Sequence, residues 1–169
     1  MSSEPLMSEP VRDPVSRVRY AFTPDGENLT VHCWLEPGGA LPPHFHPMQT
    51  EHWSVVSGEV RFRLGREKRV IGPEAGEITV APNVVHGLAS TGGDEAYLRC
   101  RVEPALHLRE FLEESAAAAR DGLFLRGGIP RGLRGTRWAA QFLARHADET
   151  VLVFPPRPIQ RLLTTLFTR

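Results

Sequence analysis

The sequence predicts a mainly β protein, in which a barrel of short antiparallel strands precedes a C-terminal helical extension. Between residues 20 and 104, short stretches of alternating apolar and polar residues are separated by turn residues, as an all-β barrel requires. After Pro104 the apolar period changes from two residues to that of a helix. We therefore expect three segments: a flexible N-terminal tail over residues 1–19, a β-barrel over residues 20–104 and helices over residues 105–169.

The strands are predicted from alternation between turn residues. Residues 60–64 show it clearly, because Val60, Phe62 and Leu64 alternate with two arginines, so that one face meets the core and the other meets water. By the same criterion we expect strands at residues 29–35, 52–57, 60–64, 69–71, 77–80, 84–89 and 96–102. The segment before the barrel is acidic, contains Ser and Pro, and lacks the apolar core of a signal peptide, which is why we expect a flexible or loosely docked tail.

Three helices are expected in the extension. The first has an apolar stripe that includes Leu108 and Phe111, continues through an alanine run and ends near Gly122. A glycine-rich stretch separates it from a second helix, which Thr136 would cap. A proline-rich break then precedes a third helix over about residues 159–167. The extension is long enough to cap the barrel mouth or to form a dimer interface.

The most informative spacing lies at the start of the barrel. Gly38 is followed by five residues, His44, one residue, His46, four residues, Glu51, six residues and Gly58. Alternate residues of a strand point to the same face, so His44 and His46 can direct two imidazoles at one point. Glu51 adds a hard oxygen ligand. Two histidines and a carboxylate with open positions are typical of a divalent transition-metal site, Fe(II) above all.

This spacing resembles the first motif of the cupin superfamily, whose members are jelly-roll barrels of antiparallel strands. The second cupin motif is matched more loosely by Gly76, Pro82 and His86. The stretch between Gly76 and His86 is one residue shorter than usual, and Asn83 or Val84 replaces a turn glycine. Asn83 is an acceptable turn residue, because asparagine tolerates a left-handed backbone.

The resemblance implies a metal centre of His44, His46, Glu51 and His86, which would hold one divalent ion per chain: Fe(II), Mn, Ni, Cu or Zn. It favours a metal-dependent dioxygenase of the quercetinase kind that acts on a small, partly apolar organic substrate. Glu51 would be a ligand, or would leave the metal to act as a catalytic base. The alternatives are a non-oxidative isomerase or polyketide cyclase that uses the same residues, and a metal-containing binding module without turnover.

Residues near the motif have less specific interpretations. Gln49 is expected to be a loop residue, with a role as ligand or acid–base neighbour as the alternative. His52 is expected on the outer face, opposite to Glu51. The strand aromatics are expected in the core, with the lining of the barrel mouth as the alternative: Tyr20, Phe22, Trp34, Trp53 and Phe62.

Composition restricts the partners. Lys and Arg together number 20 and so do Asp and Glu, so no net charge favours nucleic acid. The apolar runs are too short to span a bilayer. Cys33 and Cys100 are expected to be buried, reduced thiols of a cytoplasmic protein. We expect a small-molecule ligand or substrate and a homodimer, no nucleic acid and no membrane. The alternatives are an anion or RNA on the arginines of residues 126–137, and a membrane surface against the stripe of residues 159–167.

Overall fold

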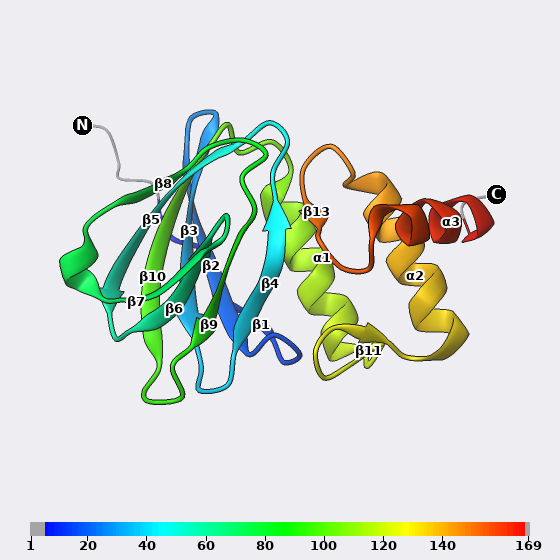
Figure 1. Cartoon of the computed structure of the whole chain (residues 1–169), viewed down its shortest axis with the longest axis horizontal. Coiled ribbons are helices and arrows are strands. Elements are labelled where there is room, and N and C mark those ends of the chain that lie inside the picture. Colours follow the sequence, from blue (N-terminus) through cyan, green and yellow to red (C-terminus); the bar gives the residue numbers. More distant parts are fainter. Residues whose placement is uncertain (1–5, 168–169) are drawn as a thin grey trace.

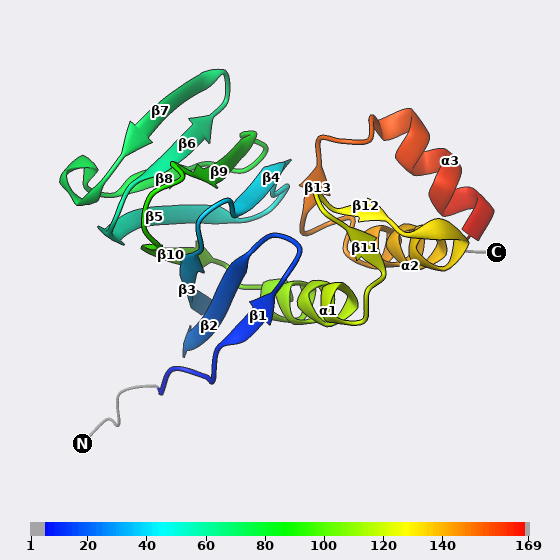
Figure 2. The same cartoon turned by 90° about the horizontal axis from the view of Figure 1, so that it is seen from below.

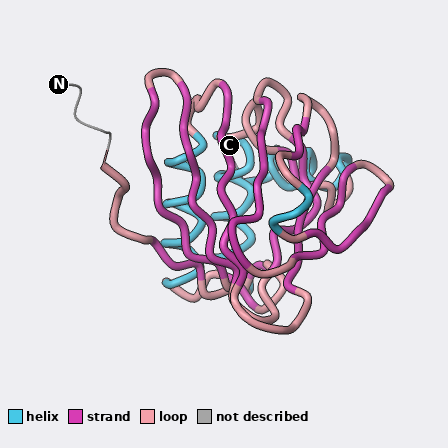
Figure 3. The backbone as a smooth tube through the Cα atoms, turned by 90° about the vertical axis from the view of Figure 1, so that its left-hand side faces the viewer, coloured by secondary structure: helices cyan, strands magenta, loops and turns pink. Residues whose placement is uncertain are grey.

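Two antiparallel sheets form the walls of a barrel in the computed structural model, which describes residues 6–167 (Figures 1 and 3). The first sheet has the strand order β1 (Val11–Asp13), β2 (Val18–Asp25), β3 (Asn28–Leu35), β10 (Ala96–Glu103), β5 (Thr50–Ser57) and β8 (Ile78–Val80). The second has the order β13 (Val151–Leu152), β4 (Ala40–Phe45), β9 (His86–Ser90), β6 (Val60–Leu64) and β7 (Glu67–Ile71). A short 3-10 turn, η1, covers Pro73–Ala75. The mainly β architecture followed by helices is confirmed.

The barrel core comes from the inward-facing residues of the alternating strands. β3 and β10 each bury every second residue, and their antiparallel register sets Leu98 opposite Cys33 and Val102 opposite Leu29. The larger core residues include Phe22, Phe62, Leu35 and Leu98, all almost fully buried. Burial of one such side chain contributes about 1.5–3 kcal/mol, so the two-residue period supplies the main stabilisation of the barrel.

The helical extension lies against one side of the barrel (Figures 1 and 2). α1 (Leu108–Arg120) runs beside β1, and α2 (Gly132–Arg145) packs on it through the rings of Phe111 and Phe142, whose centroids are 4.8 Å apart. A two-stranded hairpin of β11 (Phe124–Leu125) and β12 (Ile129–Pro130) connects these two helices. α3 (Arg157–Phe167) packs on α2 and leaves Ile159, Leu162 and Leu166 exposed. Three helices were expected here and three are found.

Part of the expected N-terminal tail lies in the sheet instead. β1 pairs with β2, and upstream of β1 the backbone N–H of Ser8 donates to the carbonyl of Phe22 at 2.8 Å. The Ser8 hydroxyl accepts from the Phe22 N–H at 3.0 Å. The prediction of a flexible tail over residues 1–19 is therefore corrected for this part, because backbone hydrogen bonds tie it to the barrel. Residues 1–5 lie outside the described chain.

The second helix begins one turn earlier than predicted. Thr136 is inside α2 and donates its hydroxyl to the carbonyl of Gly132 at 2.9 Å, so it is no cap. One of the glycines that argued against a helix here, Gly135, has a packing reason. A Cβ at Gly135 would collide with the carbonyl oxygen of Leu123, so the helix needs glycine where it approaches the hairpin.

The anion-binding and membrane-surface alternatives for the extension stay predictions. Arg126, Arg131, Arg134 and Arg137 are largely exposed to solvent, as expected for a solvated segment. Within residues 6–167, no helix combines the length and the apolar character needed to cross a membrane.

The two thiols lie inside the barrel, and we expect them to be unreactive in the folded protein. Cys33 on β3 and Cys100 on β10 are unpaired and each about 1% exposed, and burial raises the pKa of both thiols. Because the thiolate is the reactive form, a chromogenic thiol reagent at pH 8 should modify neither in native protein and both in guanidinium. A Ser57→Cys variant, exposed at the end of β5, is the positive control. Rapid labelling of either native thiol would contradict this burial.

Candidate metal centre

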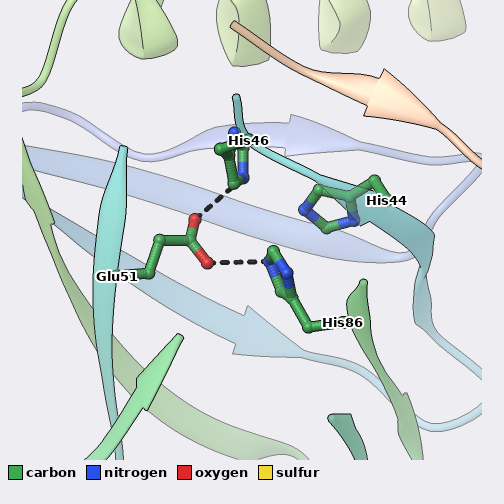
Figure 4. A group of neighbouring side chains, drawn as sticks. All are labelled: His44, His46, Glu51 and His86. Carbon is green, nitrogen blue, oxygen red and sulfur yellow. Dashed lines mark ion pairs between the residues drawn. The ribbon is translucent and has the colours of Figure 1, made fainter. Parts of the chain in front are cut away.

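Three strands bring the four predicted ligands together at one point inside the barrel (Figure 4). His44 lies near the end of β4 and is paired in register with His86, the first residue of β9. His46 follows β4, and Glu51 enters from β5, where its cross-strand neighbours are Val80 and Val102. The juxtaposition predicted from the two motifs is thus present.

The loop of the second motif also positions the first. Asn83 has φ = 64°, in the left-handed region where asparagine is tolerated, so it takes the role of the turn glycine. Its backbone N–H donates to the carbonyl of His46 at 2.8 Å. The two motifs therefore meet through the backbone as well as through their ligand side chains.

The donor atoms are close enough to share one ion. One nitrogen or oxygen from each of the four residues lies within 4.8 Å of all the others. The Glu51 carboxylate faces two imidazoles, with Oε1 3.0 Å from Nε2 of His46 and Oε2 2.8 Å from Nε2 of His86. The ring of His44 lies 4.3 Å from that of His86, centroid to centroid. His46, Glu51 and His86 are buried, whereas His44 is partly exposed.

The other ring nitrogens fix the tautomers. Nδ1 of His44 lies 2.7 Å from the carbonyl of Pro42, and Nδ1 of His86 lies 3.0 Å from that of Val84. Nδ1 of His46 lies 2.7 Å from the carbonyl oxygen of Glu149. A carbonyl only accepts, so each Nδ1 carries a proton, and Nε2 is the ring nitrogen left to hold a metal.

This arrangement leaves acceptors facing acceptors. Nε2 of His46 and of His86 is buried without a hydrogen-bond partner, and each lies beside an oxygen of Glu51. Each such pair needs a positive charge between its two atoms, either a proton on Nε2 or a metal ion. Neutral imidazoles with their Nδ1–H groups held by carbonyls, together with a carboxylate, are the ligands that first-row divalent metals take in proteins. The centre therefore fits a divalent metal by its donor chemistry.

The pKa values of His44, His46 and Glu51 are shifted by their surroundings. Burial, helped by His86 and His46, lowers the pKa of His44 to about 3, so its imidazole is neutral near pH 7. Burial alone would raise the pKa of Glu51, but its interactions with His46 and His86 hold that pKa well below the usual range. The indole N–H of Trp53 also donates to Oε2 of Glu51 at 2.7 Å, which fixes the carboxylate plane. Burial alone would lower the pKa of His46, but its contacts with Glu51 raise it, so a metal ion would have to replace a proton on Nε2.

The neighbouring candidates have structural positions. The buried amide of Gln49 donates to the carbonyls of Pro104 and Ala105, at 3.2 and 2.7 Å, and so fastens the loop to the start of the extension. His52 is on the outer face, with Nδ1 3.3 Å from the carboxylate of Glu77, as predicted. Gln49 therefore lies in a loop, as predicted.

The aromatic candidates divide between core and outer face. Tyr20, Phe22, Trp53 and Phe62 are buried in the core. Trp34 is on the outer face, where it stacks on Tyr97 with ring centroids 5.0 Å apart. Of the five, Trp53 contacts the centre, by a hydrogen bond that alternation alone does not predict.

Comparison with known proteins identifies the barrel. Residues 31–100 match the family model of the cupin domain. An RmlC-like cupin from Shewanella frigidimarina superposes with a TM-score of 0.52 at 21% identity, over 59% of this chain and 86% of that one. AerE from Microcystis aeruginosa superposes with a TM-score of 0.51 at 18% identity, over 59% of this chain and 47% of that one. The chain therefore contains a cupin domain, and its barrel has the double-stranded β-helix fold of that family.

Two fungal proteins resemble this chain in sequence. One, named an oxidoreductase, from Arthrobotrys oligospora, is 39% identical over 62 residues, which cover 36% of this chain and 24% of that protein. The other, named "Probable oxidoreductase patJ", from Aspergillus clavatus, is 36% identical over 91 residues, covering 51% of this chain and 28% of that protein. The matched region thus spans about a quarter of the length of these relatives.

Proposed function

We propose that this cupin is a metal-dependent enzyme, dioxygenase-like in its reaction, that acts on a small and partly apolar organic substrate. One observation carries the proposal: three imidazoles and one carboxylate converge, with every Nδ1 committed to a backbone carbonyl. A centre that only stabilised the fold would not need two buried Nε2 atoms without a hydrogen-bond partner beside one carboxylate, since buried polar groups without partners are costly.

Each residue of the centre has a definite task in this proposal. The three imidazoles and Glu51 would hold a divalent ion, which when bound supplies Lewis acidity and, if it is redox-active, electron transfer. The Trp53 N–H keeps the Glu51 carboxylate in place.

Two observations support an oxidoreductase reaction on a partly apolar substrate. The similar fungal proteins carry oxidoreductase names, although the match covers a minor part of each. The side chains that pair across the strands with Glu51 are Val80 and Val102, and both are buried. Apolar surroundings with few donors suit an aromatic or enol-type substrate better than a sugar phosphate.

The role of Glu51 as a base stays a prediction. Both of its carboxylate oxygens lie within 3.0 Å of an imidazole nitrogen, and one also accepts the indole N–H of Trp53. To act as a base, the carboxylate would have to leave these partners. The contacts therefore support Glu51 as a fixed ligand.

Metal content is the direct test. We expect near one first-row transition ion per chain in wild-type protein and below about a tenth in His44→Ala/His46→Ala, because two of four donors are lost. The measurement is elemental mass spectrometry on untagged protein that was purified without chelators. His52→Ala, which removes an outer-face histidine, should keep the ion. Wild-type protein that takes up no metal, even after reconstitution, would overturn the proposal.

The identity of the ion then separates the reaction classes. With iron, copper, nickel or manganese, oxygen uptake should be measured on flavonols and diketones, and His46→Ala should abolish it. A stoichiometric zinc ion without oxygen uptake would favour the isomerase or cyclase alternative. Full turnover by His46→Ala would contradict any reaction at this centre.

A further inference from the structure

The C-terminal extension reaches the centre through one short segment, residues 149–152, which we call the strap. Its two-residue strand β13 adds to the edge of β4, with Val151 opposite Phe45 and Leu152 opposite His44. The N–H of Val153 continues the pairing by donating to the carbonyl of Pro43 at 3.0 Å. In Figure 4 this orange strand passes beside the strand that carries His44. The strap therefore lies along the strand that leads into both motif histidines.

His46 depends on the strap for its alignment. Its Nδ1 lies 2.7 Å from the carbonyl oxygen of Glu149 and 3.3 Å from the hydroxyl of Thr150. The other two imidazoles are aligned locally, each by the carbonyl of the residue two positions before it, Pro42 for His44 and Val84 for His86. Of the three imidazoles, His46 is thus the one whose acceptor comes from outside the barrel.

Glu149 is anchored at both its backbone and its side chain. Its carboxylate oxygen Oε1 accepts the backbone N–H of His107 and the ring Nδ1–H of His107, each at 2.8 Å, at the start of α1. On the other side, the N–H groups of Glu149 and Thr150 donate to the carbonyl of His146, which ends α2. Glu149 and Thr150 are both buried. One residue therefore connects the junction of barrel and extension to a ligand imidazole.

From these contacts we propose that Glu149 is a positioning residue of the metal centre, and that docking of the strap and metal binding stabilise each other. The inference rests on the proposed metal-dependent function. The Glu149 carbonyl keeps the proton of His46 on Nδ1 and makes Nε2 the more basic nitrogen, as the outer partners of metal-bound histidines do. When the Glu149 side chain is released from His107, the strap is no longer anchored. The Glu149 carbonyl is then no longer held toward Nδ1 of His46. The helical extension thus has a chemical role in addition to its packing.

The test compares metal affinity in full-length variants, with Zn²⁺ titrated against a chromophoric chelator. Glu149→Ala should weaken the affinity about 10–100-fold, the usual cost of losing an outer partner. Glu149→Gln should recover most of it, because the amide oxygen can still accept the His107 N–H. The matched control is Glu114→Ala, which removes an ion pair to Arg145 at 2.6 Å and a longer contact to the ring of His146 at 3.8 Å, and leaves both hydrogen bonds from His107 to Glu149 in place. It should bind like wild type.

A second readout distinguishes alignment of His46 from general weakening. Long-range ¹H–¹⁵N spectra of the folded, zinc-loaded proteins should show His46 with its proton on Nδ1 in wild type and Glu114→Ala. In Glu149→Ala the His46 signals should shift or broaden, while those of His44 and His86 keep their positions. If Glu149→Ala does not fold, we use His107→Ala in its place. This variant removes one of the two donors that anchor Glu149, so we expect a smaller loss of metal affinity.

The outcomes separate this inference from the proposed function. If wild-type protein binds no metal, the metal-dependent function fails first. If wild type binds metal and loses it in His44→Ala/His46→Ala, but the folded Glu149 or His107 variants bind as tightly as wild type, only the role of the strap is overturned. Equal losses in Glu149→Ala and Glu114→Ala would also overturn it, since they would indicate a general effect of loosening the extension.

Discussion

Glu51→Gln is expected to lower the affinity of the centre for a divalent metal by at least about 100-fold, more than the roughly 10–100-fold loss typical of an outer partner. Glu51 is the one charged ligand of the four, and both of its oxygens face imidazole nitrogens. The amide of glutamine is neutral and can present one oxygen, while its NH₂ group would point two hydrogens toward a nitrogen that must bind metal.

The same substitution should also lower the stability of the metal-free fold near neutral pH. The contacts that hold the pKa of Glu51 low stabilise the folded protein above that pKa, and a neutral glutamine loses this contribution. Glutamine has nearly the same volume as glutamate, and its oxygen can keep the hydrogen bond from the Trp53 indole, 2.7 Å in the wild-type structure. The loss of stability without metal has to be measured separately from the effect on metal binding.

The measurement is a pair of urea unfolding curves, with and without Zn²⁺. In wild type, saturating metal at 100 times its dissociation constant should add about 2.7 kcal/mol, an increment that Glu51→Gln should lose. Glu77→Gln is the control, because Glu77 is exposed just before β8 and pairs with His52 on the outer face. Metal-dependent stabilisation of wild-type size in Glu51→Gln would contradict the assignment of Glu51 as a ligand.

The candidate site was predictable where it depends on local sequence. His44 and His46 share one strand end, and the glycines around them allow the turns that the barrel needs: Gly38 and Gly58 both have φ = 77°. His86 required a second, looser motif, and its alignment is also local, through the carbonyl of Val84. Short-range spacing therefore indicated which side chains would converge.

The rest of the site was not predictable, because its contacts are long-range. Glu149 lies 103 residues after His46. It acts partly through its backbone carbonyl, which every residue type has, so the sequence cannot indicate this contact. The strand β13 has only two residues, too few to show alternation. The hydrogen bond from Trp53 to Glu51 could not be predicted either. It requires knowing that these two residues, two positions apart on β5, both lie on the inward face.

The same distinction explains the errors in the fold. Long alternating strands such as β3 and β10 were expected within a residue or two of their observed bounds, because each carries its own burial pattern. β1 has three residues and is ordered by pairing with β2, which composition alone does not reveal. The early start of α2 depends on the close approach of Gly135 to Leu123, a tertiary contact that overrides the low helix propensity of glycine.

Phe62→Ala is expected to lower the free energy of unfolding by about 3–5 kcal/mol, which is the usual cost of truncating a buried phenylalanine. Phe62 on β6 is 2% exposed and packs edge-on against Trp53, with ring centroids 6.2 Å apart. The cavity would adjoin the indole that holds Glu51, so repacking toward the vacated space would disturb the carboxylate as well. The free energy of unfolding of such domains is roughly 5–15 kcal/mol, so the variant would lose a large share of its stability.

Thermal and urea unfolding of the metal-free proteins can measure this loss. A change of 3–5 kcal/mol corresponds to a fall in Tm of roughly 6–20 °C for a chain of this size. Val70→Ala is the matched control, because Val70 lies on the neighbouring strand β7 with its side chain 55% exposed, and it should cost less than about 0.5 kcal/mol. If the two variants were equally stable, Phe62 would not be part of a packed core. If Phe62→Ala alone were destabilised and also bound metal more weakly, the barrel core and the centre would be coupled through Trp53.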